Sequence, residues 1–207
     1  MTPEQIEAMF TRDSGDYVFA RWQRPIVPVV FGVDDKTLPV VKGAFEAVAT
    51  LAGHGIAETD PELGVNCMLF FFRDWGELTE VPDLDRLIPD LGPLVDRLIA
   101  ADAGQYRFFR FEENGAIRAA FVFIRMTPEV SAIPAETLAL AQVVQAMVLW
   151  SETAFAVQSP LAVSGETTIL RPDIADLIRA SYDPVMPVSS RDRSHALRLY
   201  ARMGAPT

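Results

Sequence analysis

Residues 106–126 read YRFFRFEENGAIRAAFVFIRM. Two runs rich in aromatic and β-branched residues, 106–112 and 116–126, flank Glu113-Asn114-Gly115. An Asn-Gly pair between such runs is typical of a hairpin with a primed turn, because both turn residues must adopt positive φ angles. The sequence therefore predicts an antiparallel hairpin in the middle of the chain.

Earlier stretches of the chain also have the composition of strands. Residues 26–32 follow Pro25 and include Pro28, and proline removes a donor from the ladder, so this strand is predicted near a sheet edge. Residues 65–73 are apolar on both faces, which is typical of a central strand. A short piece of strand is expected at 56–58.

Helices are predicted where apolar residues recur at spacings of three and four. One follows Asp34-Asp35 and ends at Gly53-His54-Gly55, where glycine suits a C-cap. A longer one, over residues 134–153, keeps only a thin polar stripe, so we expect it to be buried on most sides. Shorter helices are expected at 3–10, 91–101, 172–180 and 191–203. Residues 158–170 are expected to form a loop.

This order of elements predicts an α+β fold. We expect a mixed β-sheet of about five strands with helices packed on one face, a long buried helix at 134–153 and a helical C-terminal tail. The 207 residues, 50% of them hydrophobic, are enough to bury a sizeable core. A single domain is expected over residues 1–207, with 1–16 as an N-terminal extension and 17–203 as the core.

Composition excludes several classes of function. The formal charge of −10, from 28 acidic and 18 basic residues, has the wrong sign for holding a phosphate backbone, so no nucleic-acid partner is expected. The N-terminus lacks the apolar run of a secretory signal. No stretch approaches the roughly 18 to 20 apolar residues that a membrane helix needs, so no membrane span and a cytoplasmic location are predicted. Cys67 lies in an apolar run and is expected to be a buried, inert thiol.

Common catalytic and cofactor motifs are missing from the sequence. No Gly-x-Ser-x-Gly elbow and no glycine-rich phosphate loop occurs. His54 is expected to act at a helix C-terminus, and His195 to face solvent on the last helix. No cofactor is predicted.

The order of elements also resembles the N-terminal half of a zincin metalloprotease, in which the long helix after the sheet carries His-Glu-x-x-His. Residues 170–184, LRPDIADLIRASYDP, look like the Asp-containing C-terminal helix of matrixin-type zincins. The resemblance implies a zincin-like fold with a cleft beside the long helix.

A closer resemblance is to an uncharacterised bacterial family, domain of unknown function 2927, over about residues 17–203. It is carried by RWQRP at 21–25, GVN at 64–66, QAM at 145–147 and the segment 173–184. Some members of that family are lipoproteins, so relatives of this chain are expected to include exported proteins. The family's helix motif resembles a zincin motif that has lost its histidines.

The resemblance places the zinc-binding positions of a peptidase at Ala141 and Gln145, with the general base at Gln142 and a third ligand at Ser151. A methyl group, two amides and a hydroxyl neither hold Zn²⁺ tightly nor take a proton from water. Val148 stands where the family has glycine. The resemblance therefore implies an inactive metalloprotease homologue without bound metal.

The leading hypothesis is a non-catalytic domain that binds a protein, peptide or small ligand in a cleft between the sheet and the C-terminal helices. If the strand after Pro28 has a free edge, it is a candidate for receiving a partner strand. The candidate cleft residues are Gln142, Gln145, Ser151, Glu152 and Tyr182.

Other hypotheses remain open from the sequence. A hydrolase would use a pair of carboxylates, with Glu112, Glu113, Glu136 and Glu152 as candidates. A structural homodimer would join through apolar strands or the C-terminal helix. The segment 21–24, RWQR, sets an aromatic between two cations, which suits either a binding surface or an aromatic core with a basic corner.

Overall fold

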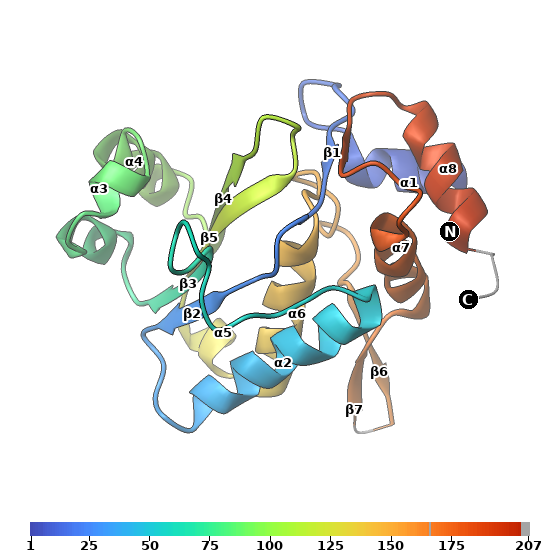
Figure 1. Cartoon of the computed structure of the whole chain (residues 1–207). Coiled ribbons are helices and arrows are strands. Elements are labelled where there is room, and N and C mark those ends of the chain that lie inside the picture. Colours follow the sequence, from blue (N-terminus) through green and yellow to red (C-terminus); the bar gives the residue numbers. More distant parts are fainter. Residues whose placement is uncertain (166, 204–207) are drawn as a thin grey trace.

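The computed structural model describes residues 1–165 and 167–203, and Figure 1 shows their arrangement. A four-stranded mixed sheet has the order β2-β3-β5-β4. Its strands are β2 (Pro28–Phe31), β3 (Cys67–Phe72), β5 (Ile117–Arg125) and β4 (Gln105–Phe111). β2, β3 and β5 run parallel, and β4 is antiparallel to β5. The predicted α+β fold with a mixed sheet is present.

The predicted hairpin is present, but the prediction of a primed turn is wrong, because Gly115 has a positive φ and Asn114 does not. β4 and β5 pair antiparallel, with a register shift between Arg110 and Phe111. Gly115 adopts a φ of +81°, in the left-handed region that glycine enters without a steric penalty. The edge position predicted for the strand after Pro25 is confirmed, because β3 is the only strand of the described residues that pairs with β2.

The main sheet has four strands rather than about five, and two short pairs lie outside it. β1 (Phe19–Ala20) pairs with β8 (Ser189–Ser190), and β6 (Leu161–Ser164) pairs with β7 (Thr167–Leu170). The loop predicted at 158–170 is therefore wrong, because four-residue strands that stand largely exposed lack a clear apolar alternation. Residues 56–58 contribute a single bridge, between Ile56 and Ile26.

Helices cover both faces of the sheet, so the prediction of helices on one face is wrong (Figure 1). One face packs on α2 (Thr37–Ala52) and α6 (Ala135–Met147), with sheet residues such as Leu69 and Val122 in that core. The other face, with Phe70 and Phe121, is covered by the excursion that follows β3. That excursion contains the 3₁₀ helix η1 (Trp75–Glu80) and the helices α3 (Leu84–Leu87) and α4 (Leu91–Ala100).

α6 is buried as predicted but ends at Met147 rather than near residue 153. Its last carbonyl groups accept hydrogen bonds from side chains of other segments. Trp22 Nε1 donates to the Ala146 carbonyl at 2.9 Å, and the Tyr182 hydroxyl donates to the Met147 carbonyl at 2.7 Å. These donors satisfy the helix end, and the chain after Met147 bridges back to the segment before β2.

The terminal helices pack beside this core. α1 (Pro3–Phe10) contacts α8 (Ser194–Met203), and α7 (Pro172–Tyr182) contacts α2 and α8. The short helix α5 (Pro128–Ser131) links β5 to α6. The predicted helices at 3–10, 91–101, 172–180 and 191–203 are present with small shifts at their ends. Across residues 1–165 and 167–203, no helix is long and apolar enough to cross a membrane.

Candidate functional site

β4 presents an unpaired edge. The Arg125 backbone N–H donates to the Gly104 carbonyl at 2.9 Å, and backbone groups of an antiparallel strand alternate between its two sides. The backbone groups of Gln105, Arg107 and Phe109 therefore point away from β5. In the part of the chain that the structure describes, β5 is the only strand paired with β4.

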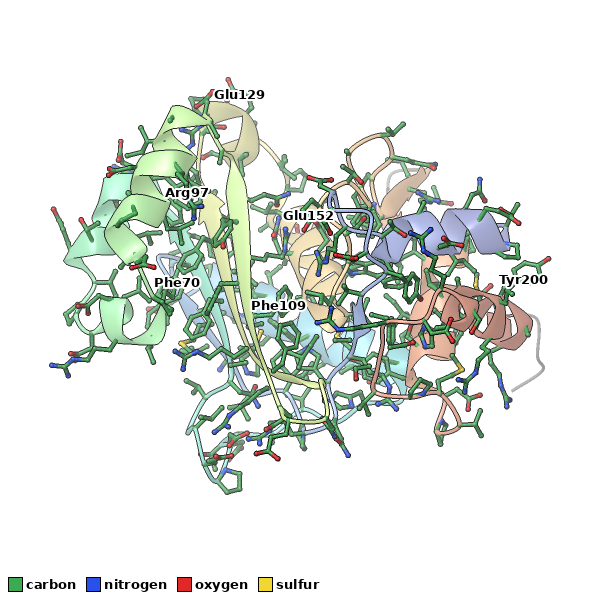
Figure 2. The ribbon with its side chains drawn as sticks, turned by 90° about the horizontal axis from the view of Figure 1, so that it is seen from above. Phe70, Arg97, Phe109, Glu129, Glu152 and Tyr200 are labelled. Carbon is green, nitrogen blue, oxygen red and sulfur yellow. The ribbon has the colours of Figure 1, made fainter. Side chains whose placement is uncertain are left out.

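The side chains of the same three residues project toward α6. Gln105, Arg107 and Phe109 stand opposite Ile124, Val122 and Ala120 of β5, which belong to the core on the α6 side of the sheet. Figure 2 shows Phe109 on this side of the strands and Phe70 on the opposite side, toward α4. Residues 105, 107 and 109 of β4 thus have unpaired backbone groups at the sheet edge and side chains that point toward α6.

A groove of about 630 Å³ lies between β4 and the C-terminal end of α6. Aromatic and apolar side chains form much of its surface, and its polar lining comes from two amides, two hydroxyls, the Arg107 guanidinium and two ion-paired residues. The segment before β1 closes one wall. The groove is lined by Arg12, Val18, residues 105–109, Phe111, Gln145, residues 149–152, Phe155 and Ala156.

A polar cluster crosses from β4 to α6. Arg107 Nη2 donates to Gln142 Oε1 at 2.5 Å and to Gln105 Oε1 at 3.2 Å, and Gln142 Nε2 donates to Gln105 Oε1 at 3.3 Å. Arg107 Nε is buried and has no hydrogen-bond partner among the described residues. Burial lowers the pKa of Arg107 to about 10. The cluster holds a cation in contact with neutral amides.

Sequence reasoning did not identify Arg107 as a site residue. The sequence did contain a sign of it, because side chains alternate between the two faces of the predicted strand and Arg107 shares a face with Phe109. A charged residue on the helix-packed face of a strand is unusual. Without the position of α6, however, the sequence did not show which face that was.

An ion pair stands at the far wall of the groove. Arg12 Nη1 lies 3.0 Å from Glu152 Oε1 and donates to the Trp150 carbonyl at 2.9 Å. The Glu152 side chain is 50% exposed, so its charge remains hydrated. Glu152 is thus neutralised in part by Arg12 rather than free to act as a general base.

Three of the five predicted cleft residues line the groove: Gln145, Ser151 and Glu152. Ser151 is buried, and its hydroxyl donates to the Ala8 carbonyl at 3.2 Å, so it also anchors α1. Gln142 belongs to the polar cluster. Tyr182 lies elsewhere, in the core, with its ring beneath the Arg21 guanidinium at 5.4 Å.

A second pocket, of about 610 Å³, lies on the other side of the polar cluster. It is more apolar than the groove, and the β6–β7 hairpin covers part of it. Gln105 lines both spaces, so the polar cluster separates the two. The remaining lining residues include Ile124, Val130, Ile133, Thr137, Leu138, Ala141, Gln142, Leu161, Ala162 and Thr168.

Both histidines have structural surroundings. His54 Nε2 lies 2.9 Å from the Arg24 carbonyl rather than on the end of its own helix, which Gly53 terminates with a φ of +64°. The prediction that His195 faces solvent is wrong. His195 is 1% exposed, and its Nδ1 lies 2.8 Å from the Tyr17 hydroxyl, because α8 turns this residue inward against α1 and β1.

Cys67 is fully buried, as predicted, and burial raises the pKa of its thiol. Trp22 is also fully buried, while Arg24 forms ion pairs with Asp60, Glu62 and Glu112. The segment 21–24 therefore places its aromatic residue in the core and Arg24 in a cluster of ion pairs.

The candidate carboxylates are dispersed. Glu136 lies in the first turn of α6, which spans about 20 Å at 1.5 Å per residue, while Glu152 follows the C-terminal end of that helix and pairs with Arg12. Glu112 pairs with Arg24, and Glu113 is exposed in the hairpin turn. Within residues 1–165 and 167–203, no group of three or more His, Cys, Asp or Glu side chains is placed to hold a metal ion.

The resemblance to zincins and to the domain of unknown function 2927 family stays a prediction. Compared with models of known protein families, with curated proteins and with solved structures, the chain matches none.

Proposed function

We propose that this chain is a non-catalytic domain that binds an extended peptide along the outer edge of β4, in the groove beside α6. The observation that carries the proposal is the coincidence of an unpaired strand edge with a lined groove. A peptide strand added to a sheet edge gains main-chain hydrogen bonds, while side-chain pockets supply specificity. Both elements are present on β4.

The size of the edge suits a short peptide. Gln105 to Phe109 present three outward residues over five positions, which corresponds to about 17 Å of strand. Phe109, Trp150 and Phe155 line the adjacent groove and offer apolar area to alternate side chains of a bound strand. Such aromatic surfaces commonly contribute much of the binding energy at protein interfaces.

The side chains of the groove favour binding over catalysis. Gln105 and Gln145 carry neutral amides, Ser151 donates to a backbone carbonyl, and Glu152 pairs with Arg12. None of these arrangements pairs a nucleophile with a free general base. If the zincin resemblance is correct, the cleft edge strand has kept its role while the metal-binding residues were lost.

The test begins with binders selected from a displayed library of ten-residue peptides, each then synthesised and titrated into isotope-labelled protein. We expect saturable chemical-shift changes in the backbone amides of Gln105, Arg107 and Phe109. Changes confined to β2, or a library that yields no binder, would contradict the proposal.

A matched pair of variants isolates the main-chain contribution. Phe109→Pro and Phe109→Ala both remove the ring, but only proline removes the outward N–H, which edge strands tolerate losing. We expect the proline variant to bind selected peptides at least tenfold more weakly than the alanine variant. Equal affinities would show that the peptide does not pair with this edge.

The homodimer hypothesis gives a different outcome in the same experiment. If the β4 edges of two copies pair, the amides of Arg107 and Phe109 change with protein concentration in the absence of peptide. Light scattering would then report a dimer that Phe109→Pro dissociates, and the peptide-binding proposal would be wrong.

A further inference from the structure

We propose that the groove recognises a carboxylate group of its ligand, through the guanidinium of Arg107. This inference rests on the proposed peptide-binding function and specifies the chemistry of the peptide. The carboxylate would come from an acidic side chain or from a free C-terminus, because both present the same planar anion to a guanidinium.

Arg107 differs in its partners from four other partly buried arginines. Arg12, Arg24, Arg125 and Arg171 each lie within 3.1 Å of a carboxylate. Arg107 instead contacts the amide oxygens of two glutamines, both of which are neutral.

Arg21 is the closest internal comparison, because no carboxylate pairs with it in the described part of the chain. Its Nη atoms donate to the carbonyls of Trp22 and Met186, and its guanidinium lies over the Tyr182 ring. These contacts tie Arg21 to the core and leave it with a structural role. Arg107 lines the groove instead.

A largely buried cation without an anion is unfavourable, because it loses part of its hydration and gains no charge partner. The chain has 28 acidic residues, yet within residues 1–165 and 167–203 none of them pairs with Arg107, which is a property of this place in the fold. A ligand carboxylate would supply the missing charge.

The surroundings favour a carboxylate over a more highly charged anion. The Arg107 guanidinium balances a single negative charge, and the other cation of the groove, Arg12, is already paired with Glu152. Phe109, Trp150 and Phe155 supply apolar area beside the cation. A carboxylate attached to an apolar or aromatic group therefore matches the groove better than inorganic phosphate does.

The experiment uses the full chain and two small probes, 3-phenylpropanoate and 3-phenylpropanamide, which differ only in the carboxylate. Titrations are followed through the Arg107 Nε–H signal in ¹⁵N-resolved spectra. We expect the acid to shift this signal saturably and to bind at least tenfold more tightly than the amide. Equal affinities, or an unchanged Arg107 signal, would overturn the inference without the need for any variant.

Two variants provide the matched control. Arg107→Gln and Arg110→Gln each remove one positive charge from β4, but Arg110 is exposed and bonds to the Leu87 carbonyl on the α4 side. We expect Arg107→Gln to weaken binding of 3-phenylpropanoate at least tenfold and Arg110→Gln to change it less than twofold. Similar losses in both variants would indicate a general charge effect and contradict the role of Arg107.

Three peptides then distinguish the source of the carboxylate. Acetyl-Val-Thr-Glu-Phe-Val-amide carries an acidic side chain, its Gln analogue carries none, and the Gln analogue with a free C-terminus carries only a terminal carboxylate. We expect one of the two acidic peptides to bind at least tenfold more tightly than the neutral one. The acidic peptide that binds more tightly identifies whether the carboxylate comes from a side chain or from a C-terminus.

The two proposals fail in different ways. If library peptides bind along β4 but removing the carboxylate has no effect, the carboxylate inference is wrong and the proposed function stands. If 3-phenylpropanoate binds at Arg107 but no peptide perturbs the Phe109 backbone amide, the groove takes small acids and the peptide-binding function is wrong.

Discussion

The two edges of the four-stranded sheet differ in what they offer to a partner. On β2, the Val27 carbonyl accepts from Cys67 N–H at 3.1 Å, so alternation turns Ile26, Pro28 and Val30 outward. Ile26 is already bonded to residues 55–57, and Pro28 has no N–H. Only Val30 keeps an outward strand donor.

β4 has the opposite character. Gln105, Arg107 and Phe109 all keep outward backbone groups, and a lined groove adjoins them. A strand at the edge of the sheet therefore does not necessarily have free backbone groups with which to bind a partner strand. The sequence hypothesis placed the receiving edge after Pro28, but the same proline that marks β2 as an edge removes part of its capacity to bind a strand.

The largest expected effect concerns the end of β2. A Cβ added at Gly32 would lie 1.8 Å from the Phe71 carbonyl oxygen, and Gly32 has a φ of +79°. We expect Gly32→Ala to lower the free energy of unfolding by about 4 kcal/mol, because steric overlap adds to backbone strain. Denaturant unfolding measures this loss.

Gly15→Ala is the control for backbone strain alone. Gly15 has a φ of +87° with no atom within 4 Å of an added Cβ, so a loss of about 1 kcal/mol is expected. Equal losses in the two variants would mean that β2 is not held tightly against β3, and the contrast between a structural edge and a binding edge would weaken.

The next largest effect is an increase in the free energy of unfolding and concerns β4. Replacing Arg107 and Gln142 together, by Met and Leu, removes an unpaired cation and its principal amide partner. We expect the double variant to raise the free energy of unfolding by about 2 kcal/mol, since apolar groups of similar size can replace buried polar groups favourably. The same variant should lose binding of 3-phenylpropanoate.

Arg110→Met is the control on the same strand, and a change within about 0.5 kcal/mol is expected for this exposed residue. A double variant that is less stable than the wild type by more than about 1 kcal/mol would show that the polar cluster stabilises the fold. The interpretation of β4 as an edge kept for binding would then lose its energetic support.

The smallest expected effect is a pH dependence of the free energy of unfolding. It arises from His195 in the core and involves neither edge of the sheet. Burial, aided by the charge of Arg198, lowers the pKa of His195 to about 4 from its ordinary value of about 6.5. The unfolded chain therefore binds a proton that the folded chain resists, so stability falls as pH decreases from about 6.5 toward 4. We expect His195 to account for a loss on the order of 1 to 2 kcal/mol between pH 7 and pH 5.

Unfolding of the wild type and of His195→Gln at both pH values measures this share. The variant should lose less stability than the wild type over the interval. Binding of 3-phenylpropanoate by folded protein should change little, because a carboxylate and a guanidinium both stay charged between pH 5 and 7. Equal pH responses of the two proteins would mean that His195 is hydrated in the folded state.

The sequence by itself determined the local elements. Asn114-Gly115 defined the hairpin turn, Gly53 ended α2, and the apolar run at 67–72 marked a central strand. These features follow from backbone sterics and from short-range periodicity, which involve neighbours within a few residues. That Ala141 and Gln145 stand at the zinc-binding positions of a peptidase helix stays a prediction from the resemblance.

Tertiary structure decided which side of each element meets which partner. Arg107 meets Gln142 only because β4 and α6, 35 residues apart at this contact, pack together, and His195 is buried only because α8 contacts α1. The excursion after β3 covers the second face of the sheet through contacts that no local period encodes. Such pairings depend on chain topology and on burial summed over distant segments. The sequence therefore determined that β4 exists, but only the packed fold made its free edge one wall of a groove.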